Sequence, residues 1–275
     1  MKNKEKIIMT IILIILLIAI ITISILKEKK GDLKIYFFNA GKADSVLISK
    51  NNKYIMIDTG EESLSNEILG YFKKNNITKL DYLIITHFDK DHVGSASVII
   101  DNIEIGEVLQ SNVPKESVYY TNYINSLNSK NITPKTVEGN YEIKLDNLKI
   151  TVNGPESIYD KNKSNNSSLI VSIINGNNSF LFMGDSENKR IKDFLSINQN
   201  TYDFIKIPYH GNYLKRLDSL IKEITPKYGV LTCSEKEGCE EETLKILDNN
   251  NVKYYLTKNG SITIYSDGKN ITVKQ

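Results

Sequence analysis

The sequence contains few residues of the kinds from which many protein sites are built. Its 275 residues include 2 cysteines and 3 histidines. A structural zinc site requires four ligands, so Cys233 and Cys239 are too few to form one alone. The two cysteines, in the segment "TCSEKEGC", lie close enough to close a short loop by a disulfide. Two free thiols in a reducing compartment are the alternative.

The chain also lacks internal repeats, low-complexity tracts and Pro/Gly-rich linkers after Gly31, so one domain is the simplest arrangement there. A hydrophobic content of 40% is too high for a disordered chain. An excess of positive charge is missing as well. Six lysines and two glutamates lie in residues 1–30, which leaves 29 basic and 31 acidic side chains in the rest. This balance counts against tight, non-specific binding of nucleic acid, though not against cleavage of a phosphodiester.

Charged residues are absent from residues 7–26, a run of twenty residues that is long enough for a helix across a hydrocarbon core of about 30 Å. The run exceeds the apolar region of a cleaved signal peptide, and no A-x-A-like site precedes the lysines that follow. We therefore expect a membrane anchor over residues 1–30, with one transmembrane helix over 7–26, and a folded domain over 31–275. Lysines flank both ends of the run, so the positive-inside rule nearly cancels. A single N-terminal span commonly works as a signal anchor, which favours a single-pass protein of the cell membrane with its domain outside.

The rest of the pattern is typical of an α/β (α+β) domain. Short β-rich runs predict strands over 33–38, 45–50 and 53–58, and apolar residues at helical spacing follow over 64–72. A continuous apolar strand is expected over 80–86, and helices from Val93 and around 117–130. Hairpins are expected to turn at 146–147, 176–178 and 267–268. Helices (186–197, 215–224, 240–250) alternate with strands (203–207, 228–232, 252–257). Two packed sheets with helices outside are predicted, but their topology does not follow.

Two of the three histidines lie five positions apart in "LIITHFDKDHVGS", residues 83–95, directly after the apolar strand. His87 and Asp89 are at positions i and i+2 of a strand end, which point to the same side and can chelate one ion. The chain must then turn, so Asp91 and His92 can reach a neighbouring ion. Imidazole and carboxylate together suit zinc, manganese or iron.

Three more strands end in polar residues of the same kinds. Asp185 follows the apolar strand of "FLFMGDS", where its carboxylate can bridge two ions, and His210 follows that of "FIKIPYHGN". Asp58 ends the strand of "MIDTG", and we expect it to orient a ligand by a hydrogen bond. Each of these residues alone is an ordinary turn or cap residue. Their joint pattern predicts a two-metal site.

The motifs, in their order along the chain, resemble the metallo-β-lactamase superfamily. The order is "FFNAGKADSVLI", "YIMIDTG", "LDYLIITHFDKDHVGS", "NNSSLIVSI", "FLFMGD", "IKIPYHGN" and "YYLTKNGSITI", covering roughly residues 32–270. More narrowly, the chain resembles the C-terminal hydrolase domain of ComEC-type DNA-uptake (competence) proteins, because of Asp89, "NAGKADS" and "NNSS". The resemblance implies an αββα sandwich with the metal site at one edge, between the sheets.

The resemblance also implies two divalent ions, zinc or manganese, and their ligands. One metal would be held by His87 and Asp89, the other by Asp91, His92 and His210, and Asp185 would bridge them. Related domains usually read HHG where this chain has Tyr209-His210-Gly211, and Tyr209 could instead place a hydroxyl near a leaving group. They often carry a further histidine where this chain reads "CSEKEGCEE".

The edge of the expected site is less well defined. Asn166 and Ser167 lie where this edge should be, and Lys215 could neutralise a phosphate. A solvated helix start is the plainer interpretation of Lys215.

The chemistry expected of such a site is hydrolysis by a hydroxide held between two metal ions, which lower the pKa of a shared water toward about 7. Asp91, Asp185 and Tyr209 are the candidate catalytic residues, Asp91 or Tyr209 assisting proton transfer. We expect a phosphodiesterase acting on nucleic acid or a cell-envelope phosphodiester, because a pair of cations suits the charge of phosphate esters.

Three other functions stay open. They are a cell-surface phosphocholine or teichoic-acid esterase, a lactam or lactone hydrolase, and a catalytically weak surface-binding domain that keeps its metal. The expected partners are the membrane, through the anchor, and DNA or an envelope polymer as substrate. No protein partner can be inferred.

Overall fold

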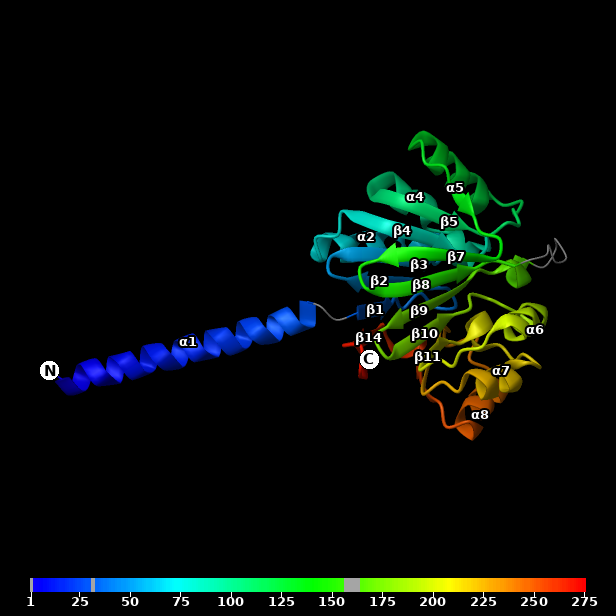
Figure 1. Cartoon of the computed structure of the whole chain (residues 1–275). Coiled ribbons are helices and arrows are strands. Elements are labelled where there is room, and N and C mark those ends of the chain that lie inside the picture. The colour runs from blue at the N-terminus through cyan, green and yellow to red at the C-terminus, as the bar shows by residue number, and fades with distance from the viewer. Residues whose placement is uncertain (1, 31–32, 156–163) are drawn as a thin grey trace. The chain divides into compact units, whose positions relative to one another are not determined.

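The computed structural model describes residues 2–30, 33–155 and 164–275, and in the first helix it describes the side chains of residues 4–20. The chain divides into two compact units, residues 1–32 and 33–275 (Figure 1). The first unit contains helix α1 (Lys2–Lys30).

Within the described residues, no helix combines the length and the apolar character that a membrane span requires. The transmembrane helix expected over residues 7–26 is therefore not supported. The side chains of residues 21–26 lie outside the described part. The membrane contact and orientation expected of this segment remain predictions.

The second unit is built on two mixed β-sheets. The first has the strand order β15-β14-β1-β2-β3-β4-β5-β6 and the second β13-β12-β11-β10-β9-β8-β7. The first sheet consists of β1 (Leu33–Phe37), β2 (Ser45–Lys50), β3 (Lys53–Thr59), β4 (Lys79–Ile85), β5 (Glu104–Gln110), β6 (Lys135–Thr136), β14 (Ile262–Ser266) and β15 (Ile271–Lys274). The second consists of β7 (Asn140–Leu145), β8 (Leu148–Asn153), β9 (Ile170–Asn175), β10 (Asn178–Phe182), β11 (Phe204–Lys206), β12 (Tyr228–Leu231) and β13 (Lys253–Leu256).

The inner faces of the two sheets pack against each other through buried aliphatic and aromatic side chains. Phe37 of β1 crosses to the second sheet, where its ring centroid lies 6.2 Å from that of Phe182 and 5.9 Å from that of Phe204. Alternate residues of each strand point to this core, as the period of two in β-strands requires. The contact holds the two sheets at a fixed distance and so places their strand ends side by side.

Helices cover the outer face of each sheet, which completes the expected αββα arrangement (Figure 1). The first sheet is covered by α2 (Ser65–Lys74), α3 (Lys90–Val93), α4 (Ala96–Asn102) and α5 (Val118–Ser129). The second is covered by α6 (Asn188–Ile197), α7 (Leu217–Ile224) and α8 (Glu241–Asn249). Helices α2, α6 and α7 are amphipathic: they bury Phe72, Ile191 and Leu220 respectively and expose their polar sides.

Two parts of the architecture differ from the sequence-based expectation, and a third, the place of the C-terminal hairpin, was left open. Strands β5 and β6 were not expected, and both pair in parallel within the first sheet. The helix expected from Val93 is two short helices, α3 and α4, separated by Gly94 and Ser95. The C-terminal hairpin returns to the first sheet, where β14 pairs with β1 in the register Leu33↔Ser266. A pairing between opposite ends of the chain leaves no local signal in the sequence.

The packing of Phe204 yields a prediction about stability. Its ring lies 5.9 Å from each of the rings of Phe37, Phe180 and Phe182. Phe204→Ala leaves a cavity between the sheets and should lower the free energy of unfolding by about 3–5 kcal/mol. Val118→Ala, at a side chain that is 63% exposed, should change it by less than about 0.5 kcal/mol. Urea unfolding of both variants checks this, and equal effects would contradict the proposed core.

Candidate metal centre

The candidate site lies where strand ends from both sheets meet. In the first sheet β3 and β4 are parallel neighbours, so Asp58 near the end of β3 lies beside the segment after β4 that carries His87 and His92. In the second sheet β10 and β11 are parallel, so Asp185 and His210 follow them at the same edge. The carboxyl ends of parallel strands are where open sheets usually bind ligands.

Four side chains from these segments converge. Each of Asp91, His92, Asp185 and His210 offers one ligand atom, and the four atoms lie within 4.8 Å of one another. His210 Nε2 is 3.0 Å from Asp185 Oδ2 and 3.3 Å from Asp91 Oδ2. His92 Nε2 is 3.4 Å from Asp185 Oδ1. Asp185 therefore lies between the two imidazoles, the place expected of a bridging carboxylate.

The inward nitrogens of all three histidines make no hydrogen bond of good geometry with a described residue, although carboxylate oxygens of Asp185 lie 3.0 Å from that of His210 and 3.4 Å from that of His92. Among the described residues, Nε2 of His87, His92 and His210 and Oδ1 of Asp185 are buried without such a bond. Buried polar atoms are normally satisfied, so four such atoms at one place require a reason. Nitrogen and carboxylate ligands within this distance suit a divalent ion such as zinc or manganese. The residues present thus fit the metal centre that the motifs predict.

The outer nitrogen of each imidazole is held by another side chain. His92 Nδ1 is 2.8 Å from Asp58 Oδ2, and Asp58 also accepts hydrogen bonds from the backbone and hydroxyl of Thr86 at 2.7 and 2.6 Å. His210 Nδ1 is 3.1 Å from Thr232 Oγ1. Metal-binding histidines typically have their second nitrogen held in this way, which fixes the direction of the first. Asp58 is therefore placed where it could orient His92, and this role remains a prediction.

His87 and Asp89 lie next to the cluster. The ring of His87 is 4.0 Å from that of His92, centroid to centroid, and its Nδ1 lies within 3.3 Å of the hydroxyls of Thr86 and Ser168. Its Nε2 is 3.9 Å from Asp89 Oδ1. Asp89 is partly exposed, and the same oxygen accepts hydrogen bonds from Ser164 and, at 2.6 Å, from Lys115. His87 and Asp89 therefore lie side by side, and Lys115 forms an ion pair with the Asp89 carboxylate.

Sequence reasoning missed Asp44 and Lys206. Lys206 is buried on β11, donates to the Gly184 carbonyl at 3.1 Å and forms an ion pair with Asp44. Asp44 Oδ1 accepts a hydrogen bond from Thr232 and lies 3.4 Å from His210 Nδ1. A lysine inside the apolar strand "FIKIP" was the available signal, because lysines are almost never buried without a partner.

The residues expected at the edge of the site are arranged differently. Asn166 accepts a hydrogen bond from the backbone of Arg190, and the Ser167 hydroxyl donates to the Ser164 carbonyl, so both side chains hold the local fold. Ser168 contacts the site instead, because its hydroxyl accepts from the Asp185 backbone at 3.2 Å. That Asn166 or Ser167 lines the substrate edge remains a prediction. Lys215 is exposed in the turn before α7.

Tyr209 precedes His210 and is half-buried beside the site. Burial raises the pKa of its phenol, and the nearby carboxylates of Glu187 and Asp185 raise it further. The hydroxyl therefore keeps its proton at neutral pH and can act as a hydrogen-bond donor. Its role in place of the usual histidine remains a prediction.

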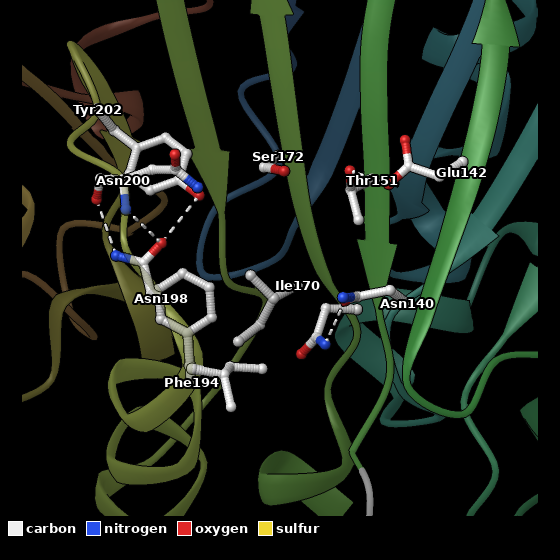
Figure 2. A pocket seen from close by; sticks show the side chains of 11 residues that line it. Asn140, Glu142, Thr151, Ile170, Ser172, Phe194, Asn198, Asn200 and Tyr202 are labelled. Carbon is white, nitrogen blue, oxygen red and sulfur yellow. Dashed lines mark hydrogen bonds between the residues drawn. The ribbon is translucent and has the colours of Figure 1, made fainter.

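A separate hollow lies on the outer face of the second sheet, between β7–β9 and the end of α6 (Figure 2). It has a volume of about 170 Å³. Its polar side chains bind one another: Asn153 donates to Asn140 at 2.7 Å, and the Tyr202 hydroxyl donates to Asn198 at 3.3 Å. None of the candidate metal ligands lines it, so this hollow is not part of the metal centre.

Charge coupling sets the protonation of the metal-free site. Burial alone lowers the pKa of His210, but the carboxylates of Asp185 and Asp44 outweigh it and raise the pKa to about 10. The pKa of His92 is likewise raised well above 6.5 by Asp185 and Asp58. Burial and the neighbouring His92 lower the pKa of His87 to about 4. At neutral pH two of the imidazoles therefore carry protons and His87 does not.

A family model described as the metallo-beta-lactamase superfamily matches residues 39–234, most of the chain. The chain belongs to the metallo-beta-lactamase superfamily. The fold agrees with this. The metallo-beta-lactamase fold protein YhfI from Bacillus subtilis is similar with a TM-score of 0.59 at 11% identity, over 86% of this chain and 100% of that one.

Two relatives of this superfamily member support the narrower resemblance. ComE operon protein 3 of Bacillus subtilis (strain 168) is 22% identical over 248 residues, which cover 81% of this chain and 31% of the relative. Recombination protein 2 of Haemophilus influenzae is 25% identical over 199 residues, 70% of this chain and 23% of the relative. The resemblance to ComEC-type proteins is thereby confirmed at low identity. The chain spans less than a third of either relative.

The raised pKa values predict that metal binding releases protons. Zinc binds the neutral form of imidazole. At pH 7, His92 and His210 should therefore together release about two protons when zinc is titrated into the metal-free protein. Calorimetry in two buffers of different ionisation enthalpy measures this number. His210→Ala should lower it by about one, whereas His87→Ala should not change it, because His87 is already neutral. A release near zero for the unaltered protein would contradict this protonation.

The same values give the metal-free protein a pH-dependent stability. The pKa of His210 is higher in the folded than in the unfolded state, where it is 6.5, so its stabilising contribution is complete below pH 6.5. The contribution is lost as pH rises through about 10. Metal-free protein should therefore be less stable to urea at pH 9.5 than at pH 6.5, and His210→Ala should reduce the difference. An equal difference in both proteins would contradict the assignment.

Proposed function

We propose that residues 33–275 form a metal-dependent phosphodiesterase whose substrate is a nucleic acid or a cell-envelope phosphodiester. Membership of the superfamily and the candidate metal ligands support a metallo-hydrolase. The observation that carries the proposal is the convergence of Asp91, His92, Asp185 and His210 from both sheets, with Nε2 of His92 and His210 and Oδ1 of Asp185 buried and without hydrogen bonds.

The candidate ligands would bind two metal ions. His87 and Asp89 would hold one divalent ion, Asp91, His92 and His210 the other, and Asp185 would contact both. Zinc or manganese, when bound, lowers the pKa of a shared water and stabilises negative charge on a phosphate. Asp58 and Asp44 would keep the imidazoles of His92 and His210 in direction, through the contacts described above.

Two observations favour a phosphodiester over a neutral ester or lactam. Lys115, whose side chain is 38% exposed, lies beside Asp89 and places a cation at the mouth of the site. One relative carries the name Recombination protein 2, which refers to a process on nucleic acid, and the other belongs to a ComE operon. We therefore place DNA first among the substrates and an envelope polymer second. The near-neutral charge of residues 31–275 fits binding at this site rather than over a wide basic surface.

The disulfide between Cys233 and Cys239 supports a location outside the reducing cytosol. An extracellular hydrolase domain remains our proposal on this basis. It does not depend on how residues 1–30 are arranged.

The first test is cleavage by the purified, metal-loaded protein. Asp185→Asn removes charge between the two imidazoles and should lower kcat/KM on single-stranded DNA or a model phosphodiester by at least about 100-fold. Asp101→Asn, at an exposed position on α4, is the matched control and should leave the rate unchanged. Cleavage of phosphocholine esters but not of DNA would identify the protein as a phosphocholine or teichoic-acid esterase instead. A protein with full metal content that cleaves no ester would be a binding domain instead.

Tyr209 allows a sharper test. If its protonated phenol donates to the leaving oxygen, Tyr209→Phe should lower kcat by roughly 100-fold on a substrate with an alkoxide leaving group. The loss should be small with a nitrophenolate, which leaves without protonation. Tyr213→Phe, at an exposed neighbour, is the control. Equal losses on both substrates would show that Tyr209 does not act as a proton donor.

A further inference from the structure

The turn that carries His210 has a backbone conformation that needs support from its surroundings. Tyr209 and His210 are consecutive non-glycine residues with φ of 54° and 55°, in the left-handed region. Such residues are strained and persist only where neighbouring structure holds them. The position of His210 Nε2 in the metal centre depends on this turn.

The segment 238–240 supplies part of that support. The backbone N–H groups of Cys239 and Glu240 donate to the carbonyls of His210 and Gly211, each at 3.0 Å. Gly238, at a φ of +77°, lies so close that an added Cβ would be 2.7 Å from the His210 carbonyl oxygen. These contacts cover the carbonyl side of the strained turn.

The disulfide ties this segment to the end of β12. Cys239 is joined to Cys233, which is fully buried. The backbone of Cys233 is fixed by Thr257, whose hydroxyl accepts from its N–H at 3.0 Å and donates to its carbonyl at 3.3 Å. One end of the bridge is therefore anchored in the core, and the other end rests on the His210 turn.

The imidazole of His210 is held from the same place. Thr232, the residue before Cys233, has its hydroxyl 3.1 Å from His210 Nδ1. The two half-cystine segments thus hold His210 from two sides, Thr232 on the ring and Cys239 on the main chain. An exposed surface disulfide that only shortened a loop would make neither contact.

We propose that the Cys233–Cys239 disulfide is a positioning element of the metal centre, which keeps His210 Nε2 beside Asp91 and Asp185 and so makes metal binding depend on the redox state of the protein. The inference rests on the proposed metal site. Reduction by a phosphine breaks the S–S bond and gives two thiols, while the phosphine takes up oxygen from water to become its oxide. Without the bridge, segment 238–240 is no longer tied to the core, and the strained turn relaxes.

The experiment measures zinc affinity of the full chain by competition with a chelating dye, with and without tris(2-carboxyethyl)phosphine. Reduction should weaken zinc binding by roughly 10- to 100-fold, the range for groups that orient metal ligands. Cys233→Ala/Cys239→Ala should reproduce the loss and should not respond to the phosphine. Glu235→Gln, in the same loop, removes an exposed ion pair with Lys258 and should leave the affinity unchanged.

A double-variant comparison separates positioning from general weakening. If the bridge acts through His210, reduction should cause no further loss of zinc affinity in the His210→Ala protein. A further loss as large as in the unaltered protein would overturn the inference, as would equal affinity in both redox states. Should the double cysteine variant fail to fold, the phosphine-treated protein, with its fold monitored by circular dichroism, provides the same comparison. Absence of zinc binding even in the oxidised protein would instead refute the metal centre itself.

Discussion

Buried carboxylates at the junction of the two sheets impose the main constraint on this structure. Asp44, Asp58 and Asp185 are each at most 3% exposed. An isolated charge in such a place costs several kcal/mol, so each carboxylate requires cations or hydrogen-bond donors around it. Lys206 supplies a fixed cation to Asp44, and the imidazoles of His92 and His210 serve Asp58 and Asp185. Burial raises the pKa of Asp185, but these two histidines outweigh it and hold the pKa well below its ordinary value.

The cations and hydrogen-bond donors around these carboxylates come from the ends of strands in both sheets, not from one continuous motif. The first sheet contributes Asp58, His92 and Asp91, and the second contributes Asp185, Lys206 and His210. The phenylalanine contacts between the sheets keep the two sets at a fixed separation. Backbone strain is also present at this edge, where Asp58, Tyr209 and His210 all have positive φ. Strain of this kind is retained where it places functional groups.

Much of the fold could be predicted because it leaves a local signal. The hairpins turn at Asp146 and Gly268 as the turn residues indicate, and the strand-end histidines and aspartates lie together because each ends an apolar strand. Two other contacts join segments that are far apart in the sequence and so leave no local signal. They are the pairing of β14 with β1 and the ion pair of Lys206 with Asp44. Ser168 rather than Ser167 contacts the site because Ser167 ends a short 3₁₀ helix (Ser164–Ser167), where its hydroxyl donates to the Ser164 carbonyl, and the sequence does not show where this helix ends.

The charges in the site bear on which substrate it suits. Asp44, Asp58, Asp89, Asp91 and Asp185 bring five negative charges, and the ammonium groups of Lys115 and Lys206 bring two positive ones. In the metal-free protein, protons on His92 and His210 offset most of the remaining charge, which is why their pKa values are raised. Exchange of these two protons for two divalent cations would leave the site with a small positive charge. A phosphodiester, with one negative charge, would then be attracted, whereas a neutral lactam would gain nothing from it. Removal of Lys206 would bring this sum to zero and cancel the attraction, so this buried lysine would affect substrate binding at the mouth of the site through its charge alone.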